Sequence, residues 1–384
     1  MSPTILLAGG GTAGHVNPLL ATADALRARG CDIVVLGTTQ GLESDLVPAA
    51  GYRLETIPKV PLPRRPSPAL LTLPGRFREA VRRARTVMQD SCVDVVVGFG
   101  GYVSTPTYRA AHSLGIPLVV QEQNARPGLA NRLGARTAAV VALTFPSTPL
   151  RALRGRTVVT GLPLRPAIAD LAAIRASEGG RMEARRAAAS RLGLDPDLRT
   201  LVVTGGSLGA QHLNEVMCAV ADELPEGTQV LHLTGRGKDA PVREAVQAAG
   251  VASRWKVLDD LRTLEDALAV ADLVVCRSGA GTVAELTALG LPAYYVPLPI
   301  GNGEQRLNAA DHVATGGALM VADHDFTAEV ARTRLLPLLV SDQLTRMGQA
   351  SAAHARTDGA QRVADLALAQ VGTTGTGRTQ GSGN

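Results

Sequence analysis

Four glycine-rich loops are the parts of this sequence whose residue types and spacing could do chemistry. They are residues 8–15 (AGGGTAGH), 98–102 (GFGGY), 205–210 (GGSLGA) and 277–282 (RSGAGT). Each follows a short apolar run that predicts a strand, and each precedes a stretch of helical period. At the start of a helix, unpaired backbone N–H groups and the helix dipole favour an anion, and glycine lets the backbone approach it. The four loops therefore predict phosphate or diphosphate binding.

The first loop also resembles a dinucleotide-binding fingerprint, which would indicate a dehydrogenase. That fingerprint requires an acid ~20 residues further on, at the end of the second strand. The second predicted strand instead ends Val35-Leu36-Gly37-Thr38. Two loops in each of two sheets fit better with diphosphate groups held in a cleft between domains, so a dehydrogenase is disfavoured.

The elements that must position these loops alternate along the chain. Short Val/Ile/Leu runs bounded by Gly or Pro alternate with Ala/Leu/Arg stretches of helical period, which is typical of βαβ units and a parallel sheet. The expected strands are residues 4–8, 32–36, 94–98, 117–121 and 139–143, then 200–204, 229–233, 254–257, 272–276 and 292–296. We therefore predict an α/β chain with two doubly wound sheets.

The length of 384 residues is too great for one ordinary core and suits two domains. The expected parts are an N-terminal domain (1–162), a C-terminal domain (163–350), a closing helix (351–371) and a disordered tail (372–384). Residues 161–166 (GLPLRP) are typical of a hinge. The first helix is expected to have Asn17 as its cap and Pro18 in its first position.

The net charge of +5 indicates anionic partners: phosphates, an acidic membrane surface or nucleic acid. Nucleic acid is disfavoured, because only 3% of the residues are aromatic and no reader motif is recognisable. The cysteines are far apart and no His stands at metal-ligand spacing, so no metal site is predicted. The chain enters a strand almost at once, which leaves no room for a signal peptide, and no apolar run approaches the ~18 residues that span a bilayer. We expect a soluble or peripheral protein.

Several motifs, in order from residue 4 to about residue 365, resemble one family. They are the first glycine loop, Val97–Tyr102, Gln121–Asn124 with Asn131, the loop at Gly205, and Cys276–Glu285. The family is that of the GT-B glycosyltransferases that make lipid II in peptidoglycan synthesis. The resemblance implies a GT-B fold, with two Rossmann-like domains whose parallel sheets face a central cleft.

The resemblance also implies an activity. The family transfers N-acetylglucosamine from UDP to the C4 hydroxyl of the N-acetylmuramoyl unit of lipid I, with inversion. The implied partners are UDP-N-acetylglucosamine, lipid I, the anionic membrane surface and other cell-wall synthesis proteins. The implied location is peripheral, at the cytoplasmic face of the cell membrane. No cofactor is expected to be required, and a divalent cation is at most a stimulant.

Matching positions carry the family's site onto this chain. The implied donor-binding residues are Arg165, Ser207, Leu258 (backbone to uracil), Ala280, Thr282, Glu285 (ribose), Glu304 and Gln305 (sugar), with Thr12 and Gly14 reaching across the cleft. The implied acceptor-binding residues are Gly11, Ala13, His15, Gly100, Gly101, Tyr102, Asn124 and Asn131. The sequence departs from the family at Ala13 (usually Gly), Leu208 (commonly Gln) and Glu304 (frequently Gln).

Inversion in one displacement needs a general base near the acceptor hydroxyl, and the candidates are His15 and Glu122. Each site residue also has a structural alternative. Glu122 could only anchor its loop, His15 could be a capping-region residue, and Arg165 a solvated side chain. Thr282 and Glu285 match a capping box, in which the glutamate bonds back to the helix cap.

The segment Lys59–Arg85 holds eight Lys or Arg side chains against one acid, Glu79, and interleaves them with apolar residues. This composition suits a segment at an anionic lipid surface. We expect a helix that packs through Phe77, Val81, Ala84 and Met88, preceded by a lipid-touching loop over 70–77.

Three other functions remain open from the sequence. Two are enzymes: another UDP-sugar lipid or natural-product glycosyltransferase, and a UDP-N-acetylglucosamine 2-epimerase of the same fold. The third is a nucleotide-binding regulatory protein without turnover.

Overall fold

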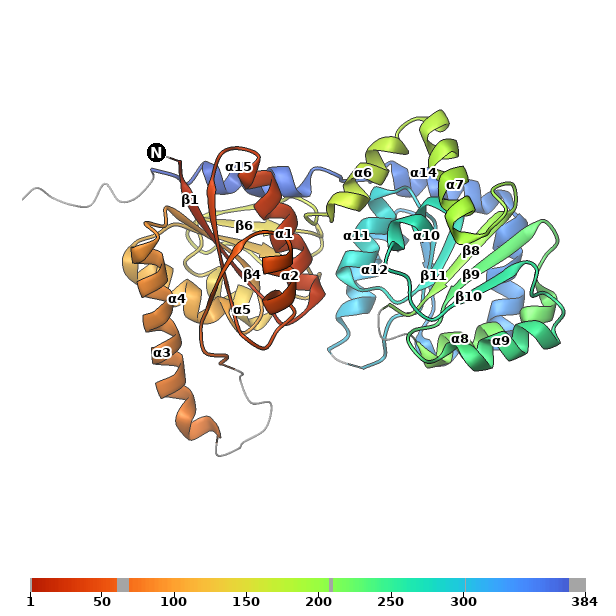
Figure 1. Ribbon diagram of the computed structural model, residues 1–384, viewed down its shortest axis with the longest axis horizontal. Coiled ribbons are helices and arrows are strands. Elements are labelled where there is room, and N and C mark those ends of the chain that lie inside the picture. Colours follow the sequence, from red (N-terminus) through yellow and green to blue (C-terminus); the bar gives the residue numbers. More distant parts are fainter. Residues whose placement is uncertain (1, 61–68, 207–209, 301, 373–384) are drawn as a thin grey trace, which may run out of the picture. The chain divides into compact units, whose positions relative to one another are not determined.

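The computed structural model describes residues 2–60, 69–206, 210–300 and 302–372 (Figure 1). The chain divides into two compact units. Unit 1 comprises Met1–Arg165 and Asp358–Asn384, and unit 2 comprises Pro166–Thr357. The sequence places its domain boundaries after residues 162 and 350, whereas the units divide after Arg165 and Thr357. The expected tail lies outside the described residues from 373 onward.

Unit 1 is built on a seven-stranded sheet of the order β3-β2-β1-β4-β5-β6-β7. All neighbouring strands are parallel. The strands are β1 (Thr4–Gly9), β2 (Asp32–Gly37), β3 (Arg53–Thr56), β4 (Val95–Gly100), β5 (Leu118–Glu122), β6 (Val140–Leu143) and β7 (Arg156–Val159). Because they are parallel, their carboxyl ends lie along one edge of the sheet, where the first two glycine loops follow β1 and β4.

Helices cover both faces of this sheet. The helices of unit 1 are α1 (Ala13–Arg27), α2 (Glu43–Ala49), α3 (Ala69–Asp90), α4 (Ser104–Leu114), α5 (Leu129–Gly134) and α15 (Gly359–Leu368). On one face, Ala84 of α3 and Tyr108 of α4 pack with Leu6 and Val96. On the other, α1 and α15 pack together over the remaining side chains of β1 and β4. The strand residues are apolar on both faces, as a doubly covered parallel sheet requires.

Unit 2 repeats the scheme with a six-stranded parallel sheet of the order β10-β9-β8-β11-β12-β13. The strands are β8 (Arg199–Thr204), β9 (Thr228–Leu233), β10 (Trp255–Leu258), β11 (Leu273–Cys276), β12 (Ala293–Tyr295) and β13 (Ala318–Met320). The helices are α6 (Pro166–Ile174), α7 (Glu178–Leu192), α8 (Gln211–Cys218), α9 (Asp239–Ala248), α10 (Leu264–Val270), α11 (Ala280–Ala288), α12 (Glu304–Ala314), α13 (Ala328–Val330) and α14 (Asp342–Ala352).

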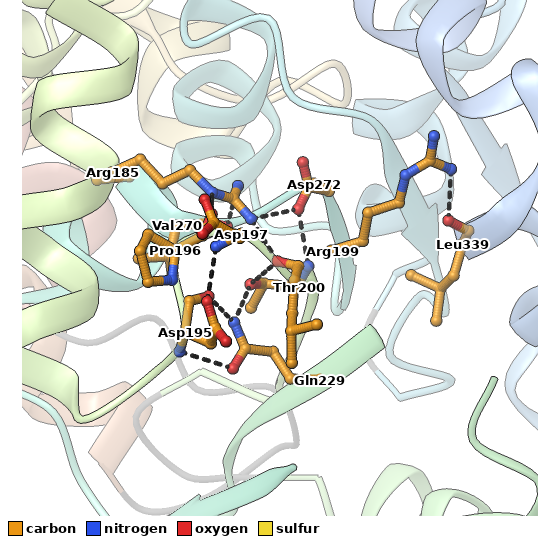
Figure 2. A network of polar contacts seen from close by, with 12 residues as sticks. Arg185, Asp195, Pro196, Asp197, Arg199, Thr200, Gln229, Val270, Asp272 and Leu339 are labelled. Carbon is orange, nitrogen blue, oxygen red and sulfur yellow. Dashed lines mark hydrogen bonds and ion pairs between the residues drawn. The ribbon is translucent and has the colours of Figure 1, made fainter. Parts of the chain in front are cut away.

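A polar network ties helix α7 to the amino ends of β8 and β11 (Figure 2). The Arg185 guanidinium donates to Asp272 Oδ2 at 3.0 Å and to the carbonyls of Pro196, Leu198 and Val270. The same Asp272 oxygen accepts the Thr200 N–H at 2.7 Å. These bonds lie at the edge of the sheet opposite the glycine loops, so the network supports the fold of unit 2 rather than a ligand.

The ten expected strands are confirmed, but the structure contains three further strands and corrects the expectations for the first helix and for residues 70–77. The sequence missed β3, β7 and β13. The first helix begins at Ala13 with Thr12 as its cap, so the prediction of an Asn17 cap is wrong. The chain turns at Gly11 (φ +89°) directly after β1, which lets the helix begin at once and leaves Pro18 inside it. The loop expected over 70–77 is instead the start of α3.

Candidate functional site

The first glycine loop joins β1 to the amino end of α1. Thr12 caps the helix with extended backbone, and Ala13 and Gly14 form its first turn. The Thr12 Oγ1 and His15 Nδ1 atoms are 2.9 Å apart, so the cap residue orients the imidazole instead of capping with its hydroxyl. The first N–H groups of a helix lack partners within it, which leaves the start of α1 suited to an anion.

The second glycine loop, after β4, lies directly against the first. Gly101 has φ +84°, and a Cβ atom there would be 2.5 Å from the Gly10 carbonyl oxygen. A Cβ atom on Gly100 would be 3.1 Å from His15 Nε2. The close approach of the two loops therefore requires glycine at both positions. Beside them, Tyr102 is 45% exposed, and Lys59 Nζ lies 5.6 Å from the centre of its ring.

His15 is half-buried where these two loops meet. Burial lowers the pKa of its imidazole below the ordinary value, although the negative charge of Glu43 and a contact with the Gly10 backbone oppose the shift. A lowered pKa keeps the ring neutral at physiological pH, the form in which it can accept a proton. The geometry is thus compatible with a base at this position, and the assignment stays a prediction.

Glu122, the other candidate base, lies at the end of β5 and is 1% exposed. Its carboxylate accepts the N–H of Asn124 at 2.9 Å, the N–H of Gly128 at 3.0 Å and the amide of Asn131 at 3.0 Å. Burial raises the pKa of Glu122, and these hydrogen bonds oppose the rise. These contacts are the ones expected of a Glu122 side chain that anchors its own loop.

Asn131 extends this network toward the second loop. Its Oδ1 accepts the hydroxyl of buried Tyr108 at 2.8 Å, and Tyr108 packs against Gly98. A Cβ atom on Gly100 would be 3.5 Å from Asn131 Nδ2. The structure therefore brings the expected acceptor residues together at or after the carboxyl ends of β1, β4 and β5: Gly11, Ala13, His15, Gly100, Gly101, Tyr102, Asn124 and Asn131. Thr12 and Gly14, which were expected to reach the donor, lie in the same first loop, and their donor contact stays a prediction.

Glu43, at the start of α2, is a residue of this site that the sequence analysis missed. Its carboxylate accepts the Gly11 N–H at 2.8 Å and both the N–H (3.0 Å) and the hydroxyl (2.8 Å) of Thr38. Burial alone would raise the pKa of Glu43, but these bonds bring it below the ordinary value. Its signal in the sequence is its position shortly after Gly37-Thr38, a few residues beyond the strand end where the dinucleotide fingerprint requires an acid.

In unit 2, the third glycine loop joins β8 to α8. Gly206 has φ +79°, and its N–H donates to Thr204 Oγ1 at 3.2 Å. The expected donor contact Ser207 and the departure at Leu208 lie outside the described residues. Behind the loop, Asn214 of α8 donates to the Thr234 carbonyl at 3.1 Å, and its Oδ1 lies 2.9 Å from His232 Nε2. Asn214 therefore fixes α8 to the end of β9.

The fourth glycine loop joins β11 to α11, whose cap is Gly279 and whose first residue is Ala280. Thr282 is consequently the third residue of the helix, and Glu285 lies in its middle. The capping-box alternative for this pair is wrong, because Gly279 holds the cap position. Glu285 is half-buried, as is Thr282. Their roles at the ribose and the diphosphate stay predictions.

Gln305 of α12 ties the fourth loop to the segment after β12. Its Oε1 accepts the Ser278 N–H at 3.1 Å and the Leu298 N–H at 2.9 Å. The Ser278 hydroxyl in turn donates to the Gln305 carbonyl at 2.9 Å. Glu304 opens the same helix after Gly303 (φ +76°). The structure thus places Glu304 and Gln305 beside the loop that carries Ala280.

Two expected donor residues lie apart from these loops in sequence. Leu258 ends β10, and its carbonyl accepts the Thr234 N–H at 2.9 Å. Arg165 is the last residue of the first segment of unit 1 and is half-buried. The uracil contact of Leu258 and the phosphate contact of Arg165 stay predictions.

In the part of the chain that the structure describes, no three His, Cys, Asp or Glu side chains converge as metal ligands would. Over the same residues, no helix has the length and apolar character needed to cross a bilayer.

Each unit contains a region that matches a domain of a known protein family. The N-terminal domain model of glycosyltransferase family 28 matches residues 5–143, and the C-terminal domain model matches residues 200–363. A relative from Bifidobacterium adolescentis is 49% identical over 96% of this chain and 97% of its own length. A relative from Clavibacter michiganensis subsp. michiganensis is 51% identical over 94% of this chain and 95% of its own length. Both are named UDP-N-acetylglucosamine–N-acetylmuramyl-(pentapeptide) pyrophosphoryl-undecaprenol N-acetylglucosamine transferase.

Among solved structures, that of Acinetobacter baumannii MurG superposes with a TM-score of 0.78. The two sequences are 29% identical, and the match covers 96% of this chain and all of the other. The α/β architecture with two Rossmann-like parallel sheets is therefore that of the GT-B glycosyltransferases, as expected from the motifs.

Proposed function

This chain belongs to glycosyltransferase family 28, and we propose that it transfers N-acetylglucosamine from UDP-N-acetylglucosamine to lipid I, giving lipid II and UDP. The observation that carries the proposal is the identity of about half of all residues, over nearly the whole length, to transferases named for this reaction. The acceptor is undecaprenyl-diphospho-N-acetylmuramoyl-pentapeptide, and the product serves peptidoglycan synthesis.

Unit 2 binds the donor in this proposal. The starts of α11 and α8 supply helix N-termini for the UDP diphosphate, as such termini do for phosphates generally. Gln305 supports the assignment, because it fixes the fourth loop through Ser278 while its amide N–H₂ remains for the sugar. Glu285 binds the ribose hydroxyls, and Arg165 and Ser207 contact the diphosphate.

Unit 1 binds the acceptor. The amino end of α1 and the second glycine loop flank the lipid diphosphate, and contact between the two loops holds both in one place. The network from Glu122 through Asn131 to Tyr108 fixes the neighbouring strand ends. Preorganised N–H groups of this kind bind an anion without paying for their own ordering.

The reaction is a single displacement at the anomeric carbon. The C4 hydroxyl oxygen of the N-acetylmuramoyl unit forms a bond to C1 of N-acetylglucosamine while the bond from C1 to the UDP oxygen breaks. UDP leaves with the electron pair, and His15 takes the hydroxyl proton. The lowered pKa and half-buried place of His15 support this role over that of Glu122, whose carboxylate is occupied by three donors. No cofactor is required, and a divalent cation is at most a stimulant.

The enzyme acts peripherally at the cytoplasmic face of the cell membrane, where it also meets other cell-wall synthesis proteins. Helix α3 supports this location: Arg78, Arg82 and Arg85 are exposed along one side of it, while Ala84 and Met88 are buried. The test is sedimentation with anionic vesicles. Arg78→Glu with Arg85→Glu is expected to reduce binding severalfold, and Arg186→Glu with Arg346→Glu, the same charge change on exposed residues of unit 2, is the control. An equal loss of vesicle binding in both double variants would mean that α3 does not support this location.

The activity is tested by UDP release from UDP-N-acetylglucosamine with and without a soluble lipid I analogue. Release that depends on the acceptor supports the transferase. Interconversion of the sugar without acceptor would instead identify an epimerase, and donor binding without either product would identify a regulatory protein.

A further inference from the structure

The Glu43 carboxylate lies beneath the first glycine loop and is the feature of unit 1 that the proposed reaction leaves unused. The side chain is 1% exposed. Its Oε2 accepts the Gly11 N–H at 2.8 Å, and its Oε1 accepts the Thr38 N–H and hydroxyl at 3.0 and 2.8 Å. One carboxylate thus joins the turn after β1 to the end of β2, the neighbouring strand.

Glycines form the walls around this carboxylate. A Cβ atom on Gly10 would be 2.4 Å from Glu43 Oε1, and one on Gly37 would be 2.6 Å from Glu43 Cγ. A Cβ atom on Gly41 would also overlap the carboxylate, at 2.0 Å from Oε2. Contacts under 3.0 Å are closer than real side chains allow, so the chain leaves a space at three positions that this carboxylate fills. Gly10 of the first loop, together with Gly37 and Gly41, therefore makes room for an internal anion.

Other α/β folds also hold an acid near the position of the Glu43 carboxylate. A dinucleotide-binding fold has an acid at the end of its second strand, and that acid faces the ribose of the ligand. Here the acid reaches the end of β2 from the start of α2, and it turns inward to the backbone of its own loop. The Gly11 N–H is therefore engaged before any substrate arrives. The N–H groups of Ala13 and Gly14, in the first turn of α1, are left for an external anion.

We propose that Glu43 is a positioning residue for the acceptor: it locks the Gly10–Gly11 turn and so assigns the acceptor diphosphate to the first turn of α1, beside His15. The inference rests on the proposed function, since it names the residue that shapes the acceptor half of that site. Glu43 acts through Gly11 and touches no substrate. Its bonds also keep the carboxylate ionised, because they bring its pKa below the ordinary value despite burial.

The central variant is Glu43→Gln, which preserves size but offers only one acceptor atom to the two N–H groups. The Gly11 or the Thr38 N–H must then face an amide N–H₂. A hydrogen bond to a charged group is generally strong enough that its loss shifts an equilibrium about tenfold or more. We expect the KM for the soluble lipid I analogue to rise about tenfold while the KM for UDP-N-acetylglucosamine stays within about twofold. Thr38→Val removes only the hydroxyl contact and is expected to give a smaller change in the same direction.

The matched control is Asp272→Asn in unit 2, where a carboxylate also accepts a backbone N–H, that of Thr200 (Figure 2). This contact lies at the edge of the sheet opposite the glycine loops. The control variant measures what destabilisation alone does to both KM values. A second readout needs no turnover: amide hydrogen exchange of residues 9–16 in the free protein. Glu43→Gln is expected to accelerate exchange there about tenfold, and Asp272→Asn to leave it unchanged.

Each outcome of the KM and hydrogen-exchange measurements either supports or overturns the inference. An acceptor-selective rise in KM with faster exchange in residues 9–16 supports the inference. An unchanged acceptor KM, or equal rises for donor and acceptor as in the control, overturns it. If the wild-type protein releases no acceptor-dependent UDP, the proposed function fails by itself. Exchange then decides whether Glu43 locks the turn: unchanged exchange in Glu43→Gln overturns that lock.

Discussion

Substitutions of Gln305 can distinguish a residue that holds the donor site together from one that contacts the donor. Its Oε1 accepts two backbone N–H groups, those of Ser278 and Leu298, while its N–H₂ is assigned to the sugar. Gln305→Met removes both functions. Gln305→Glu keeps an acceptor oxygen for the two N–H groups but loses the N–H₂ and adds a charge beside Glu304.

The expected cost follows from the two lost acceptors. A buried N–H left without a partner costs about 1–3 kcal/mol, and the Leu298 contact is exposed, so it contributes less than the half-buried Ser278 contact. The total for Gln305→Met is about 1.5 kcal/mol. In a domain of the size of unit 2, this lowers the Tm by about 3–6 °C. Gln305→Glu is expected to melt within about 1 °C of the wild type.

The assay pairs thermal unfolding with the KM for UDP-N-acetylglucosamine at saturating acceptor. Both variants are expected to raise this KM about tenfold, because both lose the sugar contact. A wild-type Tm for Gln305→Met would refute the loop-tying role. A Gln305→Glu protein with low Tm would show that the oxygen does not carry it, and one with unchanged KM would refute the sugar contact.

Three further predictions concern charged or titrating groups. Glu285→Ala should raise the donor KM about tenfold and change the Tm by less than about 2 °C, since Glu285 lies in the middle of α11 and not at its cap; kinetics and melting measured together decide between ribose binding and a structural role. For His15, burial lowers the imidazole pKa, so kcat/KM should fall on the acid side with a midpoint below 6.5, and a midpoint above that value would exclude His15 as the base. For Glu43, the folded pKa is below the ordinary 4.5, so its stabilising contribution is present above that pH and is lost as the pH falls through the lower folded value. Urea unfolding should therefore show that Glu43→Gln reduces the acid-induced loss of stability, and an unchanged pH dependence would contradict the assignment.

The sequence predicted the central strands because each contains a short apolar run that is buried in its sheet. The strands that it missed have a different character. β3 and β7 are the edges of their sheet, and their residues are half-buried or exposed. β13 is likewise an edge and has only three residues. An edge strand is covered less completely, so the hydrophobic pattern that marks a strand is weak there.

The site was predictable where it depends on local sequence. The glycine loops could be found because a strand, a turn and a helix follow one another within a few residues. Glu43 could not be found in this way, since its partner Gly11 is 32 residues away and the two meet only through the pairing of β1 with β2. The prediction of a capping box at Thr282 was wrong because the helix begins earlier, with Gly279 as its cap.

The return of the chain to unit 1 has a consequence for synthesis on the ribosome. Val363, Ala364 and Ala367 of α15 are fully buried in the same core cluster as Ile5 and Leu19. Unit 2 is one continuous segment, so it can close its core as soon as Thr357 has emerged. The first half of the chain emerges earlier but lacks α15 until all of unit 2 has been made. Unit 1 therefore begins folding first and finishes last, and through that interval the apolar face over β1 and β4 is the surface that a chaperone would have to shield.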